Sequence, residues 1–594
     1  MNPRDIAIVG MACRYPDASN PDQLWSNLIS RRSSFRPIPK SRWDHSLYYV
    51  EGRTRDTYTT YCDRAALLDQ PFVFDGPGFD IAPLRAESMD PQQRIMLEIT
   101  REALHDAGLD GDHWDRSTAA TFLGVSTSEF SLMCSAPVRA RQLASGQFGE
   151  PFDPAQAIAA SSRFGPVRSY SLPGSLQSMC ATNLSQVFDF RGPAFTIDSA
   201  CASSLTAVVQ AVHYLRSAPE GGPAPVALAG GIFMMMVPDA LVGFSRIGAV
   251  AAHECRPFDS DSSGFLMGEG GGVVILKRLS DALRDGNPVY AILRGVAWNS
   301  DGRADNPMTV GLEGHSQLIE LGLRDCGLQL NDFGYVECHG TATRTGDTVE
   351  LQSLAHHLKG SNRPFLGSIK ANIGHTMSAA GVAGLLRAVL ALHHREIPPQ
   401  ANWNAWHPDL NALQDRFRIP TGVEPWDQPL PRALVSSFGF GGTNALVALQ
   451  APDQPARAVA RPLPGPRPTY RPYKADEAEP ESDIRLPPGP GVLQRLARLE
   501  LDPPFLLEDL DLDGGRARRT LGRVPPRVGE PSGLGIASEL DALLPPSVRP
   551  VRFGCCEALG DEPLQLHLSG QGAHLFRRGR LAAWLEFEPN TSAI

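Results

Sequence analysis

The sequence contains no run of about 18 or more apolar residues, the length that a membrane-spanning helix needs. Its first ten residues carry Arg4 and Asp5 and lead directly into an apolar segment, without the basic start and long apolar stretch of a secretory signal. Positive charge is not in excess, because 55 lysines and arginines stand against 65 aspartates and glutamates, for a net charge of −10. We therefore expect no membrane span, no signal peptide and no non-specific binding to nucleic acid, which requires a cationic face.

The ten cysteines are scattered along the chain, and only Cys555 and Cys556 are adjacent. None of them forms a CxxC pair or a Cys/His spacing typical of a zinc site. Reduced thiols in a cytoplasmic enzyme are therefore the expected state, and no metal site is predicted. The remaining composition, with 42% hydrophobic and 20% charged residues, is typical of a globular protein.

Length and composition divide the chain into three regions, because 594 residues exceed one compact domain of ordinary size. Residues 1–450 alternate short β-rich apolar runs with alanine-rich helical stretches, the pattern of an α/β fold. Residues 451–490 contain eleven prolines with charges between them, which predicts an extended linker. Residues 491–594 again alternate apolar and polar residues, as around Leu566, so a small β-rich module is predicted there.

Two segments place a chemically reactive residue between a strand and a helix. The run Phe195–Cys201 leads into one helical pattern, and the run Phe365–His375 leads into another. The likeness of the two segments predicts an internally duplicated fold, whose pseudo-two-fold would bring Cys201 and His375 together. At a third junction, His339 follows an apolar strand and precedes a glycine and two threonines.

Cys201 is a candidate nucleophile because of this setting. A helix N-terminus stabilises a thiolate through its dipole and its free N–H groups, which predicts a lowered pKa for the thiol. The alternative is a buried structural cysteine, the ordinary role of this residue in a globular protein. His339 and His375 lie in loops of small residues, where a histidine is more often a hydrogen-bonded structural residue. The residues alone leave both interpretations open.

A series of short motifs occurs in one order along residues 5–450 and resembles the β-ketoacyl synthases of type I polyketide and fatty-acid synthases. That family has a thiolase-like, duplicated five-layer α/β fold, which is the expected fold of this region. So many motifs in order favour the catalytic interpretation of the cysteine and of both histidines. The matching runs are Met89–Arg94, Arg191–Pro193, Asp198–Leu205, Arg256–Asp259, Gly268–Gly270, Cys338–Thr341, Gly346–Asp347, Lys370–His375 and Gly439–Asn444.

The resemblance implies an acyltransferase that performs a decarboxylative Claisen condensation. Cys201 would accept an acyl group from a phosphopantetheine thioester. His339 and His375 would then donate hydrogen bonds to the enolate formed from a malonyl thioester. The backbone N–H groups of Cys201 and Phe440 would bind the oxyanion of acyl transfer, and the Phe440 ring would gate the nucleophile.

Five further residues match supporting positions of the family. Thr341 and Thr343 would hold the pantetheine arm. Lys370 would order the site through an ion pair with Glu350, and Asp347 would support the same site. The chain also departs from the family pattern, since an alanine at position 342 stands where glycine is usual.

The resemblance also implies partners. Substrates would arrive on the phosphopantetheine of an acyl carrier protein, no bound cofactor is implied, and a homodimer is expected. The sequence has no Gly-His-Ser-x-Gly run of an acyltransferase and no Asp-Ser-Leu run of a carrier protein. A separate acyltransferase would therefore supply the malonyl extender.

The C-terminal region carries a weaker resemblance. Pro503–Asp513, followed by Arg516–Arg518, resembles the opening of a hotdog-fold hydroxyacyl dehydratase, but the Gly-His-Phe-Pro loop of that family is missing. Residues 491–594 are therefore expected to form a degenerate, non-catalytic hotdog-like module. An unrelated β-rich docking module is the alternative.

Two other functions compete with the condensing enzyme. A chain-length factor is a non-catalytic partner subunit of a synthase complex and normally lacks the cysteine, so Cys201 favours the enzyme. A thiolase pairs its nucleophile with a second active-site cysteine near the end of the chain, and Gly439–Asn444 contains none. The acyl primer, the number of extensions and the product are not predicted.

Overall fold

The computed structural model describes most of the first 453 residues and a set of strands nearer the C-terminus. The described residues are 2–52, 58–111, 113–144, 169–219, 222–303, 310–453, 470–472, 518–521, 548–555, 564–569, 572–577 and 580–589. Most of the predicted linker, 451–490, thus lies outside them.

The chain forms two compact units. The first comprises Met1–Pro71, Met89–Ser135 and Arg168–Pro466, and the second comprises Phe72–Ser88, Ala136–Val167 and Arg467–Ile594. All the residues predicted to form the catalytic site belong to the first unit.

A ten-stranded mixed sheet forms the core of the first unit, in the order β11-β10-β14-β15-β9-β1-β8-β7-β5-β6. This large mixed sheet confirms the predicted thiolase-like α/β class for the N-terminal region. Its strands are β1 Ile6–Arg14, β5 Ala120–Gly124, β6 Ala194–Ile197, β7 Val226–Phe233, β8 Gly270–Arg278, β9 Ala291–Ser300, β10 Tyr335–Glu337, β11 Phe365–Gly367, β14 Arg432–Phe438 and β15 Thr443–Gln450.

The sheet consists of two halves with the same topology. In the half β1, β5, β6, β7 and β8, the first strand along the chain is innermost and the third is at the outer edge. The half β9, β10, β11, β14 and β15 repeats this order. Read from the outer edge, each half has two parallel pairings followed by two antiparallel ones. The repeated topology agrees with the predicted duplication, and pairing of Ile6–Ile8 with Ala291–Leu293 joins the halves into one sheet.

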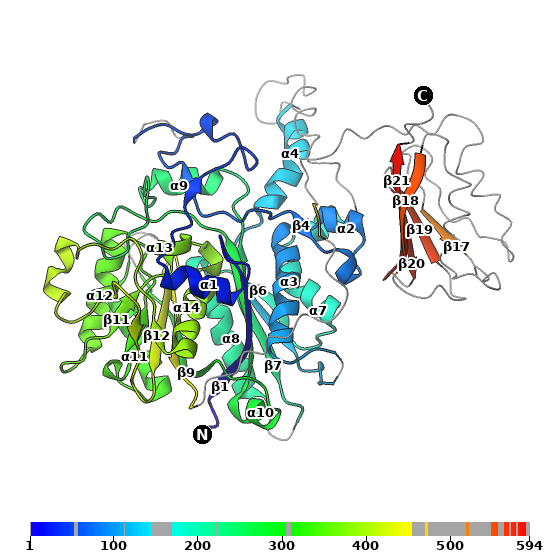
Figure 1. Cartoon of the computed structure of the whole chain (residues 1–594). Helices are drawn as coiled ribbons and strands as arrows, with labels where there is room; N and C mark the ends of the chain where they lie inside the picture. Colours follow the sequence, from blue (N-terminus) through cyan, green and yellow to red (C-terminus); the bar gives the residue numbers. More distant parts are fainter. Residues whose placement is uncertain are drawn as a thin grey trace. The chain divides into compact units, whose positions relative to one another are not determined.

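Two helices lie between the halves. α8 (Ser203–Ser217) and α14 (Ala380–His394) contact each other and strands of both halves, as Figure 1 shows. α8 follows β6 and α14 follows β11, so they occupy equivalent places in the two repeats. Alanine, valine and leucine dominate both helices, which allows close packing on every side. The two junctions singled out in the sequence therefore meet at the centre of the unit.

Other helices cover the outer faces of the two halves (Figure 1). On one half these are α3 (Pro91–Asp106) and α7 (Met179–Phe188), and on the other α11 (Leu312–Cys326) with α12 (Arg344–His357) beside it. The remaining α-helices of the described residues are α1 Pro21–Ile29, α2 Pro83–Ser88, α4 Glu129–Ala144, α6 Ser171–Ser175, α9 Asp239–Arg246, α10 Leu279–Arg284 and α13 Lys370–Ile373.

One helical segment, Met377–His394, is long and apolar enough by length and composition to cross a membrane. It contains α14, and 89% of it is buried inside the unit. Packing between the two halves of the sheet accounts for this apolar composition, so the segment gives little support for a membrane span.

The described strands of the second unit form a five-stranded sheet in the order β17-β19-β20-β21-β18, in which all neighbours are antiparallel. They agree with the predicted β-rich module, while its hotdog-like character stays a prediction. The strands are β17 Arg518–Leu521, β18 Val548–Cys555, β19 Leu564–Ser569, β20 Gly572–Arg577 and β21 Arg580–Pro589. In the same unit, β16 (Arg471–Pro472) pairs with β4 (Val73–Phe74).

Candidate active site

Cys201 lies in a single-turn helix, η4 (Ala200–Ala202), between β6 and α8. Ala200 has φ 51°, a left-handed conformation that costs roughly 1–2 kcal/mol for a residue with a Cβ. The Ser203 hydroxyl holds this turn, because it accepts from the Ser199 N–H at 2.9 Å and donates to the Ala200 carbonyl at 2.6 Å. The strained turn places the thiol just before α8 rather than within it.

Cys201, His339 and His375 converge from three different junctions. The Cys201 Sγ and one ring nitrogen of each histidine all lie within 4.8 Å of one another. The two imidazole rings meet edge to face, with their centroids 5.4 Å apart. The structure thus brings together all three residues that the sequence predicted to be catalytic.

Hydrogen bonds fix the proton positions on both imidazoles. The Lys370 Nζ lies 3.4 Å from the His339 Nδ1 and donates to the His339 carbonyl at 2.6 Å. The Met377 N–H donates to the His375 Nδ1 at 3.2 Å. An ammonium and a backbone N–H only donate, so each Nδ1 is an acceptor and each Nε2 carries the ring proton.

Both histidines are neutral in this environment. Burial, and after it the positive charge of Lys370, holds the pKa of His339 and of His375 well below the usual range. The site therefore presents two uncharged Nε2–H donors next to a thiol.

The carboxylate of Glu350 holds the loop that carries His339. It accepts from the backbone N–H groups of His339 at 2.8 Å and Gly340 at 2.9 Å, and from the Ser436 hydroxyl at 2.6 Å. The prediction that Glu350 forms an ion pair with Lys370 is wrong, because these two described residues make no direct contact of that kind. Lys370 instead binds His339, so both charged groups hold the loop that carries His339.

Asp347 holds the next part of the same loop. Its carboxylate accepts from the Phe258 N–H at 2.8 Å and from the Ala342 N–H at 3.1 Å, and burial raises its pKa to about 7. Ala342 has φ 59°, which explains why glycine suits this position in the family. The hydroxyls of Thr341 and Thr343 lie 2.9 Å apart on either side of Ala342.

The backbone N–H groups of Phe440 and of Cys201 itself act electrostatically on the Cys201 thiol, and both favour its ionised form. Burial nevertheless raises the pKa of this thiol, and the Phe440 N–H, the charge of Lys370 and the Cys201 N–H oppose the shift. The predicted lowered pKa is therefore wrong, because burial outweighs these opposing groups. The Phe440 ring is 51% exposed and meets the Phe244 ring edge to face, with centroids 6.5 Å apart.

One residue near the site was missed by sequence reasoning. His315 lies on α11 and is buried, and its ring stacks on Phe438 with centroids 3.5 Å apart. Phe438 in turn meets His339 edge to face at 5.8 Å. Burial lowers the pKa of His315 to about 3, and its Nδ1 has no hydrogen-bond partner among the described residues. A lone histidine on an amphipathic helix gave no signal for this contact.

Two family models match the chain in the region that holds this site. The model of the β-ketoacyl synthase N-terminal domain matches residues 3–282, which include Cys201. The model of the β-ketoacyl synthase C-terminal domain matches residues 290–404, which include His339 and His375. The chain belongs to the β-ketoacyl synthase family.

Solved ketosynthase structures are similar to this synthase. The ketosynthase from module 6 of the bacillaene synthase of Bacillus subtilis 168 is 30% identical, with a TM-score of 0.63 over 76% of this chain and 72% of that chain. The oxazolomycin ketosynthase domain of Streptomyces albus JA3453 is also 30% identical, with a TM-score of 0.66 over 76% of this chain and 74% of that chain.

A much longer curated relative is similar over the same region. One of the subunits of the phenolphthiocerol/phthiocerol polyketide synthase of Mycobacterium tuberculosis is 37% identical over 474 residues, which are 78% of this chain and 20% of that protein. The synthase thus spans about a fifth of the length of this relative. Together with the solved structures, this relative shows that the chain is a ketosynthase similar to those of type I polyketide synthases.

Proposed function

We propose that this synthase joins an acyl group held on Cys201 to a malonyl thioester carried by an acyl carrier protein, with loss of CO2, and so extends a polyketide or fatty-acyl chain. The observation that carries the proposal is the grouping of one thiol and one ring nitrogen from each of two neutral imidazoles within 4.8 Å of one another. A nucleophile and two donors for a developing oxyanion are what a condensing acyltransferase requires.

In the first half-reaction the Cys201 thiol loses its proton, and the thiolate attacks the carbonyl carbon of the incoming acyl thioester. In this proposal the backbone N–H groups of Cys201 and Phe440, which favour the thiolate, also stabilise the oxyanion on that carbonyl. The carbon–sulfur bond to the carrier then breaks, and the pantetheine thiol leaves with a proton. The acyl group remains on Cys201.

In the second half-reaction the malonyl thioester loses CO2. The electrons of the broken carbon–carbon bond pass to the thioester carbonyl, and His339 and His375 donate hydrogen bonds to the resulting enolate oxygen. Neutral imidazoles are weak acids, so they stabilise this enolate without protonating it. The enolate carbon then attacks the acyl carbonyl on Cys201 and expels the thiolate, which leaves a β-ketoacyl chain on the carrier.

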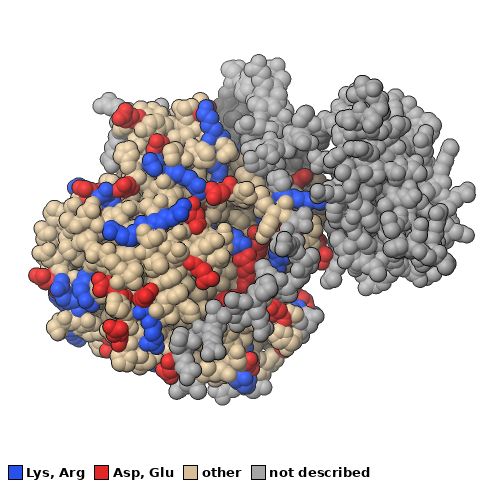
Figure 2. All heavy atoms as spheres, in the orientation of Figure 1, with Lys and Arg blue, Asp and Glu red and all other residues tan. Residues whose placement is uncertain are grey.

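We also propose that the substrates arrive on a phosphopantetheine arm, held by the partly exposed Thr341 and Thr343. On the face shown in Figure 2, basic and acidic side chains of the described residues are interspersed, without a broad field of either sign. Recognition of an acidic carrier would therefore depend on a local basic patch. A separate acyltransferase would load the malonyl group.

Mass spectrometry on the full chain tests the proposed function. Incubation with a panel of acyl carriers should produce an acyl adduct on the peptide that contains Cys201, and addition of malonyl carrier should produce a β-ketoacyl carrier and CO2. If neither the adduct nor the product forms with any carrier, the proposal is wrong. An outcome of that kind would favour the non-catalytic, chain-length-factor-like function.

We further propose a homodimer that forms through β6. This strand ends the ten-stranded sheet, so one of its backbone edges is unpaired within the described residues, and Phe195 on it is 43% exposed. An open apolar edge strand favours pairing with a second copy.

Phe195→Lys should therefore turn a dimer into a monomer, because a lysine on an edge strand opposes strand pairing. Light scattering on the wild type at micromolar concentration should give twice the 64.2 kDa chain mass, and the variant should give that mass once. Val423→Lys is the matched control, since Val423 is also 43% exposed but lies before β13 (Glu424–Pro425). A monomeric wild type would contradict the dimer.

A further inference from the structure

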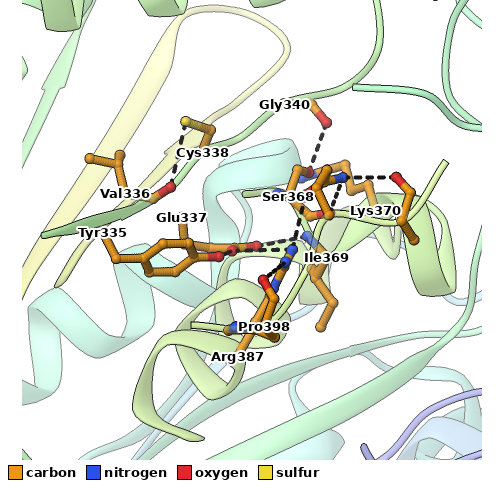
Figure 3. Close-up of polar contacts among 12 residues, drawn as sticks. Tyr335, Val336, Glu337, Cys338, Gly340, Ser368, Ile369, Lys370, Arg387 and Pro398 are labelled. Atoms are coloured by element: carbon orange, nitrogen blue, oxygen red, sulfur yellow. Dashed lines mark hydrogen bonds and ion pairs between the residues drawn. The ribbon is translucent and has the colours of Figure 1, made fainter. Parts of the chain in front are cut away.

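Beneath the catalytic residues lies a buried carboxylate that the proposed mechanism does not use. Glu337 is 1% exposed and ends β10, two residues before His339. The Tyr335 hydroxyl donates to its Oε2, and the Arg387 Nη1 lies 3.6 Å from the same oxygen. Figure 3 shows these three side chains pointing toward one another, next to Ile369 and Lys370. A buried charge of this kind requires a structural or functional reason.

Arg387 is shared among several acceptors rather than devoted to Glu337. Its Nη2 donates to the carbonyls of Pro399 at 3.2 Å and Pro398 at 3.4 Å, and its Nη1 donates to the Gln400 Oε1 at 3.4 Å. The packing is close, because a Cβ on Gly367 would lie 2.3 Å from the Tyr335 hydroxyl and 3.1 Å from the Arg387 Cζ. Glu337 is thus fixed in place without its charge being fully neutralised by a close ion pair.

The second carboxylate oxygen of Glu337 reaches the loop that carries Lys370. The Ile369 N–H donates to the Glu337 Oε1 at 2.8 Å, and Ile369 directly precedes Lys370 at the start of α13. Beside it, the Ser368 hydroxyl donates to the carbonyl of Gly340, the residue after His339, at 2.9 Å. Glu337 therefore ties the end of β10 to the backbone from which Lys370 extends.

We propose that Glu337, held by Tyr335 and Arg387, is a positioning residue that keeps Lys370 against His339 and so fixes the Nε2–H tautomer of His339. The residue touches neither the thiol nor a histidine ring, and it acts through Lys370. Its effect on catalysis rests on the function proposed above, whereas its effect on the tautomer does not.

The electrostatics of Lys370 agree with this assignment. Burial lowers the pKa of Lys370, and the groups that oppose this shift are, in order, Glu337, Cys201, Glu350 and Cys255. The neighbouring His339 and His375 are neutral and supply no opposing negative charge. Loss of the charge on Glu337 should therefore lower the pKa of Lys370 further. A neutral Lys370 amine could accept a hydrogen bond from a protonated Nδ1 of His339. This contact would allow the tautomer of His339 that carries its proton on Nδ1.

Glu337→Gln tests the role, because glutamine keeps the size of the side chain and an acceptor for the Ile369 N–H but removes the charge. We expect CO2 release from malonyl carrier to fall by about 10-fold, as for other residues that orient a catalytic group. Acylation of Cys201 should fall less than CO2 release at neutral pH, because Lys370 is only one of three groups that favour the thiolate. The alkaline limb of the decarboxylation profile should move to lower pH, because a Lys370 with a lower pKa loses its proton earlier as the pH rises.

Glu102→Gln is the matched control. Glu102 is also paired with an arginine, Arg14, but it lies on α3 and touches none of the catalytic loops. The rate of CO2 release by Glu102→Gln, and the pH profile of that rate, should equal those of the wild type. If Glu337→Gln folds as judged by its thermal unfolding and still shows the wild-type rate and profile, the positioning role is overturned.

Nitrogen-15 spectra of the histidine side chains provide a readout that needs no activity. His339, assigned by the loss of its signals in His339→Asn, should have its proton on Nε2 in the wild type, and Glu337→Gln should show a population with the proton on Nδ1. Identical tautomers in both proteins would overturn the proposal.

If Glu337→Gln does not fold, Tyr335→Phe replaces it. This variant should show a smaller shift of the His339 tautomer in the same direction, while an unchanged spectrum would again overturn the proposal. A wild type that neither decarboxylates nor condenses would refute the proposed function, and the spectra would still decide the role of Glu337.

Discussion

Cys201→Ala should abolish chain extension and leave the fold intact. The substitution removes the thiol that we propose to hold the acyl chain covalently, so we expect condensation to fall on the order of 10⁴-fold or more. Removal of one sulfur atom leaves a small cavity, which should cost about 1 kcal/mol of unfolding free energy or less. The measurements are β-ketoacyl product by mass spectrometry and the thermal unfolding temperature.

A matched variant separates the loss of the nucleophile from the loss of a buried sulfur. Cys326 is a buried free cysteine at the end of α11, so Cys326→Ala should unfold at a similar temperature and condense at the wild-type rate. In Cys201→Ala, slow CO2 release from malonyl carrier should persist, because both imidazole donors remain. Condensation at a normal rate without Cys201 would refute its assignment as the nucleophile.

His339→Ala and His375→Ala should each block decarboxylation of the malonyl thioester. Each change removes one of two donors to the enolate oxygen, and loss of a single preorganised donor costs on the order of 100-fold in rate or more. Acylation of Cys201 should survive at least in part, since the groups that favour its thiolate include the backbone N–H groups of Cys201 and Phe440 and neither histidine. The two half-reactions should therefore separate in these variants.

Carbon dioxide release and acyl-enzyme formation, measured on the same preparations, test this division of labour. His113→Ala is the control, because His113 is exposed and its ring nitrogen contacts only the Gly108 carbonyl among the described residues. If both active-site variants release CO2 as fast as this control, the proposed roles of His339 and His375 are wrong.

The grouping of Cys201, His339 and His375 could be predicted from the sequence because each of these residues follows a strand. Cys201 after β6, His339 after β10 and His375 after β11 lie at the same end of parallel-paired strands, and the repeated topology of the two halves brings those ends together. Strand and helix patterns are local in the sequence, so the junctions could be recognised without knowledge of the packing.

What the sequence could not predict depends on distant contacts and on burial. Spacing gives no information on whether Lys370 meets Glu350 or the His339 ring. The raised pKa of the Cys201 thiol depends on how much water the finished site excludes, which a helix N-terminus alone does not determine. The stacking of His315 on Phe438 joins α11 to β14 across more than a hundred residues, and no local pattern marks it.

The tautomers of the two histidines also determine which ring nitrogens are free to bind a metal ion. A cysteine and two histidines whose ligand atoms lie within 4.8 Å could supply three of the four ligands of a tetrahedral zinc ion. Zinc would need the lone pair of each Nε2, and the ring proton would then have to move to Nδ1. The Nδ1 of His339 faces the Lys370 ammonium, and the Nδ1 of His375 faces the Met377 N–H. Neither of these groups can accept a hydrogen bond. The hydrogen bonds that prepare the imidazoles for an enolate therefore also disfavour the binding of a zinc ion through both rings.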